Sequence, residues 1–195
     1  MKTIVFLISV CLIASTSVLS QAYPKGVQVN EMAPDFLVKN QFGEPISLHA
    51  ELQKGPVVIV FYRGEWCPYC NKQLKRLEDS LYLIKEKGAT LIAITPEKPE
   101  NIQKTIQKTG ASYSILFDEG LKIMKSYDVA FEVDNITIAR YKNFNIDLVA
   151  ANGNNGANLP VPALFIIDKK GKIIFRHFDP DYKVRVSVQE VLSHL

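Results

Sequence analysis

Residues 57–70 read VVIVFYRGEWCPYC, and this stretch decides the fold class. Its first six residues, 57–62, form a continuous apolar, β-branched and aromatic run, which is typical of a strand buried on both faces. Over residues 68–87 the apolar positions recur every three or four residues with charged residues between them, which predicts an amphipathic helix. A buried strand, a tight loop and a helix in this order predict an α/β protein with two cysteines where the helix begins.

Strands and helices alternate along much of the remaining chain. The order is βαβα, then βα, then ββα, and such alternation favours a sheet with parallel strands in its first half. Gly171 provides the positive φ that the turn of a late hairpin needs. Ser187 and Glu190 form a capping box that opens the last helix. The sequence predicts strands at 33–38, 46–48, 57–62, 90–95, 113–117, 163–168 and 172–177, and helices at 68–87, 99–109, 119–127 and 188–195.

Residues 131–159 differ from the rest because they show no sustained period. They end in the turn-forming run ANGNNGAN at 151–158, and we interpret them as an inserted loop region. Long loops are only sometimes functional. The segment is therefore either a plain surface loop or a lid over a substrate.

The composition is that of one globular domain. The chain has 195 residues, of which 47% are hydrophobic, and a net charge of +3, which excludes a disordered chain. Basic residues are scattered among acidic ones, so the basic stripe that nucleic acid requires is missing and no nucleic-acid partner is expected. The sequence shows no internal repeat and no second domain.

The N-terminus predicts export. Lys2 supplies a positive charge, residues 4–14 an apolar run, and residues 20–22 a small-x-small cleavage site, which together are typical of a secretory signal peptide. A membrane anchor is the alternative, but spanning a bilayer takes about 20 apolar residues and this run is shorter. The sequence therefore predicts a signal peptide at 1–22 and a single domain at 23–195 in a periplasmic or secreted protein.

Removal of the signal peptide also removes Cys11 and leaves two cysteines, Cys67 and Cys70, in a compartment that permits disulfides. Cys67 falls at the first turn of the predicted helix, where free N–H groups and the helix dipole favour a thiolate. Cys70 lies one turn later on the same face, so the two sulfurs can form a disulfide. Arg63 adds positive charge, whereas Glu65 opposes thiolate formation. These features predict a redox-active thiol pair with Arg63 as a supporting residue.

A Cys-x-x-Cys pair has two other common uses. It is half of many zinc sites, but the histidines that could complete one, His49, His177 and His194, are not at paired spacing, so no metal is expected. A structural disulfide would close a very short loop, which constrains the unfolded chain little. Redox chemistry is the interpretation that we favour.

Four motifs resemble one known family. They are FYRGEWCPYC at 61–70, APDF at 33–36, PVPALFIID at 160–168 and HFDPDY at 177–182. Together they resemble the peroxiredoxin-like branch of the alkyl hydroperoxide reductase and thiol-specific antioxidant (AhpC/TSA) family, over residues 30–195. The resemblance implies a thioredoxin-like α/β fold: a central mixed sheet flanked by helices, with a peroxiredoxin-type extension and the inserted region described above.

The resemblance also implies roles for single residues. Cys67 matches the peroxidatic cysteine of the family, Cys70 resembles a resolving cysteine, and no metal or organic cofactor is implied. Pro162 resembles the cis-proline that thioredoxin-fold proteins hold beside the active disulfide. The family ordinarily carries Thr or Ser three residues before the peroxidatic cysteine and Arg on a late strand, whereas this sequence has Gly64 and Pro162 at those places.

Three functions follow from these features, and a thiol peroxidase is the one that we expect. In that function Cys67 attacks a peroxide and becomes a sulfenic acid, Cys70 condenses with it to a disulfide, and an external, thioredoxin-like dithiol reduces the disulfide. The first alternative is a thiol-disulfide oxidoreductase whose substrates are disulfides of other exported proteins. The second alternative is a non-enzymatic redox sensor or binding module.

Overall fold

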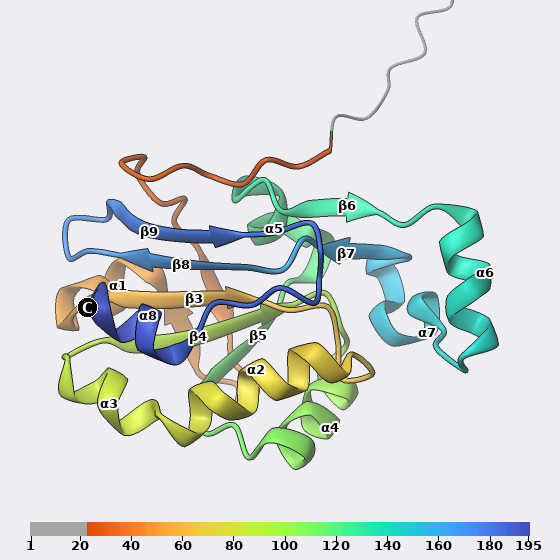
Figure 1. Ribbon diagram of the computed structural model, residues 1–195, viewed down its shortest axis with the longest axis horizontal. Helices are drawn as coiled ribbons and strands as arrows, with labels where there is room; N and C mark the ends of the chain where they lie inside the picture. The colour runs from red at the N-terminus through yellow and green to blue at the C-terminus, as the bar shows by residue number, and fades with distance from the viewer. Residues whose placement is uncertain (1–22) are drawn as a thin grey trace, which may run out of the picture.

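The computed structural model describes residues 23–195, so the predicted signal peptide at 1–22 lies outside the described residues. The central strands are β3 Val57–Phe61, β4 Thr90–Thr95, β5 Ser114–Phe117, β8 Ala163–Ile167 and β9 Ile173–Phe178. They form one five-stranded sheet in the order β5-β4-β3-β8-β9 (Figure 1). β3, β4 and β5 are parallel, whereas β8 runs antiparallel to both β3 and β9. The predicted mixed sheet is confirmed.

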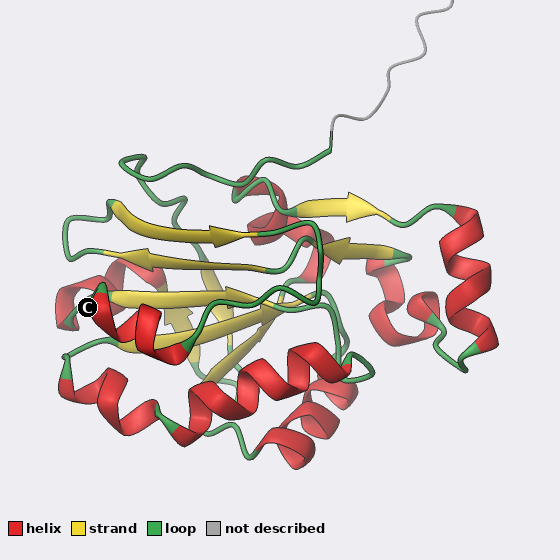
Figure 2. Cartoon of the chain, in the orientation of Figure 1, coloured by secondary structure: helices red, strands yellow, loops and turns green. Residues whose placement is uncertain are grey.

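Helices cover both faces of this sheet (Figure 2). One face packs against α2 Pro68–Asp79, α3 Leu81–Glu86, α4 Pro99–Thr109 and α8 Val188–Ser193, and the other against α1 Leu48–Lys54 and α5 Lys122–Ser126. The side chains of β3 alternate between the two cores: Val58 and Val60 face α2, while Val57, Ile59 and Phe61 face α1 and α5. All five are 0% exposed. The prediction of a strand buried on both faces is therefore confirmed.

The single helix predicted over 68–87 is wrong, because the chain breaks it into α2 and α3 at Ser80. The φ and ψ of Ser80 are −114° and 11°, outside the helical region, and its N–H is bonded to Glu78 O. Serine favours such helix ends because its hydroxyl competes for backbone hydrogen bonds. Leu81 and Ile84 nevertheless pack in the same core as α2, so the apolar spacing continues across the break and conceals it.

Residues 131–159 are not the irregular loop that their sequence predicts. β6 Ala130–Glu132 and β7 Asn158–Pro160 pair antiparallel, and between them lie α6 Asn135–Asn143, α7 Leu148–Asn152 and the 3₁₀ turn η2 Gly153–Asn155. Val133, Leu148 and Leu159 form a small core of their own. Because α6 buries no residue fully, it carries no apolar stripe that the sequence could reveal.

Most of the other predicted elements agree with the structure, apart from shifts at their ends. The helix predicted at 119–127 is wrong as a single helix, because the 3₁₀ turn η1 Glu119–Leu121 ends at Leu121, whose φ is +60°, before α5 begins. The sequence did not predict α1.

Two short strands near the start, β1 Leu37–Lys39 and β2 Pro45–Ser47, pair with each other antiparallel outside the central sheet. The hairpin joining β8 to β9 turns at Gly171, whose φ is +82°. Ser187 Oγ accepts a hydrogen bond of 3.1 Å from Glu190 N at the start of α8. None of the helices in residues 23–195 is long and apolar enough to cross a bilayer.

The segment that joins α1 to β3 requires a glycine at position 55. A Cβ placed on Gly55 would lie 1.8 Å from the carbonyl oxygen of Gly88, which is backbone and cannot swing away. We expect Gly55→Ala to lower the free energy of unfolding by about 3 kcal/mol, because the chain must shift to relieve the overlap. Urea unfolding followed by far-UV circular dichroism measures this change.

Gly43→Ala is the control for that substitution. A Cβ on Gly43 meets no atom within 4 Å, and only its φ of +83° disfavours alanine, so we expect a loss of about 1 kcal/mol. Equal losses in the two variants would contradict the steric account of position 55.

Candidate active site

Cys67 and Cys70 lie where the sequence predicts, at the N-terminus of α2. Cys67 is the N-cap residue, Pro68 occupies the first turn, and Cys67 Sγ accepts a hydrogen bond of 3.3 Å from Cys70 N. An N-cap side chain that accepts from a free N–H of the first turn is favourable, and more so when it carries negative charge. Both cysteines are free thiols with 0% exposure.

Arg63 reaches the sulfur of Cys67 from the loop between β3 and α2. Its Nη2 donates to Cys67 Sγ at 3.3 Å, and its Nη1 donates to Tyr141 Oη at 2.8 Å. Arg63 is only 5% exposed, and within residues 23–195 its guanidinium pairs with no carboxylate. The sulfur of Cys67 is therefore the group that can neutralise this buried cation.

Aromatic rings enclose the Arg63 guanidinium on two sides. Arg63 Cζ lies 3.7 Å from the ring centroid of Tyr182 and 5.1 Å from that of Trp66. Trp66 also packs on Tyr141, and Tyr182 packs edge-on against Tyr69, with centroids 5.2 and 5.6 Å apart. Tyr141 belongs to α6 of the inserted region, so that region contributes directly to the site. Cation–π contacts of this kind hold a guanidinium in one orientation.

The two thiols have opposite protonation preferences. A hydrogen bond from the Cys70 thiol, together with the positive charge and N–H of Arg63, overcomes burial and lowers the pKa of Cys67 to about 5. Burial raises the pKa of Cys70 above its ordinary value, and the hydrogen bond that Cys70 donates to Cys67 raises it further. At neutral pH the pair therefore consists of a Cys67 thiolate, which is the nucleophilic form, and a Cys70 thiol.

Arg185 is a second cation at the site, and our sequence analysis missed it. It precedes α8, 115 residues after Cys70, and its Nη2 contacts Cys70 Sγ at 3.5 Å. The positive charge of Arg185 favours the thiolate form of Cys70. The only signal in the sequence was its place three residues after the HFDPDY motif at 177–182. Each sulfur thus has its own arginine.

A buried carboxyl group explains why residue 64 is a glycine. A Cβ on Gly64 would lie 2.4 Å from Trp66 Nε1 and 2.6 Å from Glu97 Oε1, so the threonine or serine usual in the family does not fit. Glu97 is 0% exposed; its Oε2 accepts from Glu65 N at 2.7 Å, and its Oε1 has no partner. Burial is the main cause that raises the pKa of Glu97 to about 8. Glu97 therefore fills the space that a side chain at 64 would take.

The expected cis peptide bond at Pro162 is wrong, because residues 23–195 contain no cis peptide bond. Pro162 is buried at the entrance to β8, where Ala163 pairs with Phe61 of β3. Val161 N donates to Val129 O at 2.8 Å, which keeps the chain extended from β7 into β8. The trans form is also the intrinsically favoured one. Pro162 thus lies at the same end of the sheet as the cysteine loop, with an ordinary peptide bond.

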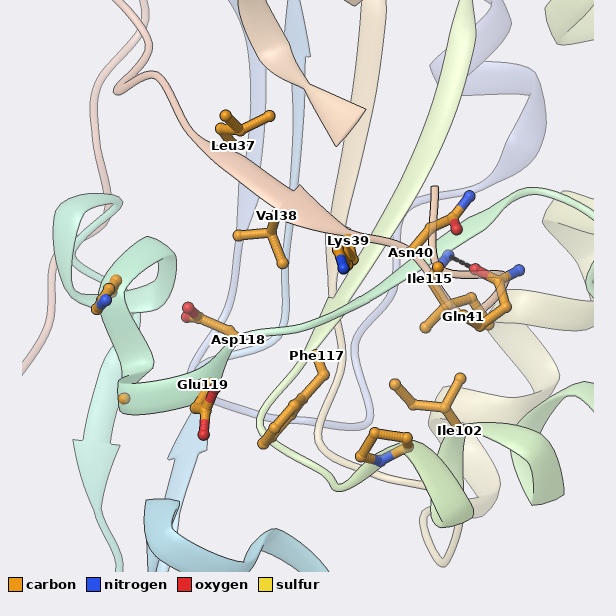
Figure 3. Close-up of a pocket in the computed structure, with 14 residues that line it drawn as sticks. Leu37, Val38, Lys39, Asn40, Gln41, Ile102, Ile115, Phe117, Asp118 and Glu119 are labelled. Carbon is orange, nitrogen blue, oxygen red and sulfur yellow. Dashed lines mark hydrogen bonds between the residues drawn. The ribbon is translucent and has the colours of Figure 1, made fainter. Parts of the chain in front are cut away.

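A cavity of about 630 Å³ lies away from the cysteines, between β1, β5 and the start of α4. Figure 3 shows residues of this cavity, where Gln41 Oε1 accepts from Ile115 N at 2.7 Å. No residue of the 62–70 loop lines it. In the part of the chain that the structure describes, no three His, Cys, Asp or Glu side chains group as metal ligands.

The sheet order and the dithiol at the start of α2 define the class of protein: a thioredoxin-like fold with a Cys-x-x-Cys site. Comparison with known families makes this more specific. The AhpC/TSA family model matches residues 29–176, and the chain belongs to that family. The resemblance that the sequence motifs suggest is confirmed.

Relatives and solved structures agree with this assignment. Chloroplastic peroxiredoxin Q of Gentiana triflora is 34% identical over 103 residues, which are 53% of this chain and 47% of that protein. The thiol-disulfide oxidoreductase ResA of Halalkalibacterium halodurans is 30% identical over 103 residues, 52% of this chain and 57% of that protein. The chain spans about half the length of the curated relatives it matches.

The solved structures share the fold at low sequence identity. Peroxidoxin BcpB from Mycobacterium tuberculosis has a TM-score of 0.66 at 19% identity, covering 85% of this chain and 94% of that one. Peroxiredoxin Q from Xanthomonas campestris has a TM-score of 0.61 at 16% identity, covering 81% and 87%. The predicted thioredoxin-like fold of the peroxiredoxin type is thereby confirmed.

Replacement of Arg63 tests the electrostatics of the thiolate. Because Arg63 supplies a charge and a hydrogen bond to Cys67 Sγ, we expect Arg63→Gln to raise the pKa of Cys67 by about 1–2 units from its value of about 5. The pH dependence of iodoacetamide alkylation of the reduced protein measures this pKa. Arg140→Gln, which removes an exposed arginine of α6, is the control; an unchanged midpoint in Arg63→Gln would contradict the assignment.

The raised pKa of Glu97 predicts that the stability of the fold depends on pH. The pKa of Glu97 in the folded state is about 8, above the ordinary value of 4.5. The contribution of this carboxyl group to the free energy of unfolding is therefore complete below about pH 4.5 and is lost as the pH rises through 8. Between pH 5 and 8 we expect wild-type stability to fall relative to Glu97→Gln by on the order of 2 kcal/mol. Urea midpoints of both proteins under reducing conditions give this difference. Parallel pH profiles would mean that Glu97 does not retain its proton in the fold.

Proposed function

We propose that the protein is a thiol peroxidase that acts on small hydroperoxides. The Cys67 thiolate attacks the distal oxygen of the peroxide, the O–O bond breaks, and the leaving alkoxide or hydroxide takes up a proton. Cys67 becomes a sulfenic acid. The Cys70 thiol then attacks this sulfur, a Cys67–Cys70 disulfide forms and water leaves. An external thiol reductant supplies the two electrons that restore both thiols.

The contact between the Arg63 guanidinium and Cys67 Sγ carries this proposal. It holds the thiolate at neutral pH and places N–H donors beside the atom that attacks the peroxide. The family ordinarily uses a late-strand arginine to position the peroxide, and Arg63 offers the same chemistry from the loop before α2. Relatives named peroxiredoxin Q support the same function.

A thiol-disulfide oxidoreductase is the second candidate, because relatives named ResA match and the two cysteines share the Cys-x-x-Cys spacing. The burial of the site favours the peroxidase. Both sulfurs are 0% exposed, and the Tyr182 ring lies over Arg63 beside them. A hydrogen peroxide molecule fits such a site more readily than the disulfide of a folded protein, which must reach the sulfur itself.

Export is part of the proposal and rests on the signal peptide that residues 1–22 predict. In an exported compartment Cys67 and Cys70 would be the two cysteines of the mature chain, and the reductant that restores them would act outside the cytoplasm. Expression of the full chain with a C-terminal tag, followed by N-terminal sequencing of the exported form, tests the cleavage after Ala22.

Peroxide consumption and insulin reduction, measured on one preparation, distinguish the two enzymes. With dithiothreitol as reductant we expect rapid loss of hydrogen peroxide, a loss of activity of at least about 100-fold in Cys67→Ser, and little insulin reduction. Slow peroxide loss with fast insulin reduction would replace the peroxidase by the oxidoreductase. If neither activity depends on Cys67, the cysteine pair is not the active site of either enzyme.

A further inference from the structure

A cationic cavity of about 210 Å³ is lined by residues of α2, of the segment that joins β9 to α8, and of the start of α8. Figure 1 shows where α2, β9 and α8 lie. The apolar part of its lining consists of Leu77, Val186 and Val188, together with the ring of Tyr69. Four of its nine lining residues are cations and none is acidic. These cations, which we call the cationic set, are Lys72, Arg76, Lys183 and Arg185.

In the described part of the chain, no carboxylate forms a salt bridge with the cationic set. The three salt bridges found in residues 23–195 involve Lys54, Lys75 and Lys108, none of which lines the cavity. Arg185 Nε is buried and has no hydrogen-bond partner in the described chain. Four like charges around one hollow repel one another, and an anion that enters the hollow relieves this repulsion.

The cavity is connected to the reacting sulfurs through side chains that belong to both. Arg185 lines the cavity and contacts Cys70 Sγ at 3.5 Å. Tyr69 also lines it and packs against Tyr182, whose ring covers the guanidinium of Arg63. An anion held in the cavity therefore shares one side chain, that of Arg185, with Cys70 Sγ.

We propose that the cationic cavity binds the carboxylates of a small thiol that reduces the Cys67–Cys70 disulfide. The proposal deepens the proposed function and rests on it, because the peroxidase reaction forms that disulfide. A small thiol is favoured over a protein reductant because both sulfurs are 0% exposed. A thiol with one or two carboxylates and a short carbon chain matches the charge of the cavity, its apolar lining and its volume.

The reaction balances with two thiols. The thiolate of the bound molecule attacks Cys67 Sγ, a mixed disulfide forms there, and the bond to Cys70 breaks. Cys70 leaves as a thiolate beside the guanidinium of Arg185, which favours this form, and then takes up a proton. A second thiol attacks the mixed disulfide, so that Cys67 returns as a thiolate. Two thiols are oxidised to one small disulfide, and the protein disulfide gains two electrons.

The test measures reduction of the preformed disulfide by matched thiols. The wild-type protein is first oxidised with one equivalent of hydrogen peroxide. It is then mixed with glutathione, N-acetylcysteine or the neutral N-acetylcysteine amide. The reaction is quenched with N-ethylmaleimide, and mass spectrometry counts the free thiols. With rates expressed per thiolate, we expect the carboxylate thiols to react faster than the amide by about 10-fold at low salt, and this preference to shrink at 0.5 M NaCl.

Two variants separate the cavity from general surface charge. In the double variant Lys72→Gln, Arg76→Gln we expect the preference for carboxylate thiols to fall by about five-fold, since two of the four cations are lost. Lys75→Gln is the control: Lys75 is also on α2 but is paired with Asp79 and lies outside the cavity, so the preference is expected to stay. Both variants change exposed side chains, and both should react with neutral dithiothreitol like the wild type.

Four outcomes would overturn the proposal, and the last would overturn the proposed function too. Equal rates for the carboxylate thiols and the amide show that the cavity does not select an anionic thiol, and so does a preference that survives the double variant. A fast reaction with an acidic thioredoxin-like protein alone would assign the cationic set to a protein partner. Failure of the disulfide to form with peroxide would overturn the proposed function as well, whereas normal peroxide consumption with dithiothreitol leaves that function intact.

Discussion

The contact between the guanidinium of Arg63 and the sulfur of Cys67 is the interaction on which the rest of the site depends. A cation that is only 5% exposed needs an opposite charge, and within residues 23–195 no carboxylate pairs with it. The Cys67 thiolate meets this need, and the cation in turn stabilises the thiolate. Tyr141 and the Tyr182 ring then hold the guanidinium in place, so distant parts of the chain converge on one ion pair.

The fold provides the positions for this ion pair. β3 is buried on both faces, and its C-terminal end delivers the 62–67 loop to the N-terminus of α2, where the free N–H groups of the first turn meet Cys67 Sγ. Such an edge of a sheet, at the carboxyl ends of parallel strands, is where α/β proteins commonly bind ligands. Tyr141 of the inserted region and Tyr182 of the segment before α8 lie against Arg63, and the two cysteines at this helix terminus are fully buried.

The sequence predicted those parts of the site that are close together in the chain. Cys67, Cys70 and Arg63 fall within one loop and one helical turn, and the α/β order of the elements follows from strand and helix periods, whereas the mixed sheet was implied by the resemblance; the structure confirms both. The remaining parts depend on tertiary contacts between distant segments. Arg185 touches Cys70 across 115 residues, and Tyr141 lies on a helix without a fully buried residue, so no local sequence pattern could predict either contact. Pro162 was assigned by resemblance alone, and its trans bond shows that resemblance does not determine backbone geometry.

The central claim is that Cys67 attacks the peroxide while Cys70 waits as a thiol, and the most direct measurement asks which sulfur receives the oxygen. Cys70→Ser and Cys67→Ser are each treated with one equivalent of hydrogen peroxide in the presence of dimedone, and the adducts are located by tandem mass spectrometry. The account predicts a single dimedone adduct on Cys67 in the first variant and none in the second. An adduct on Cys70, or an unmodified Cys67, would contradict it.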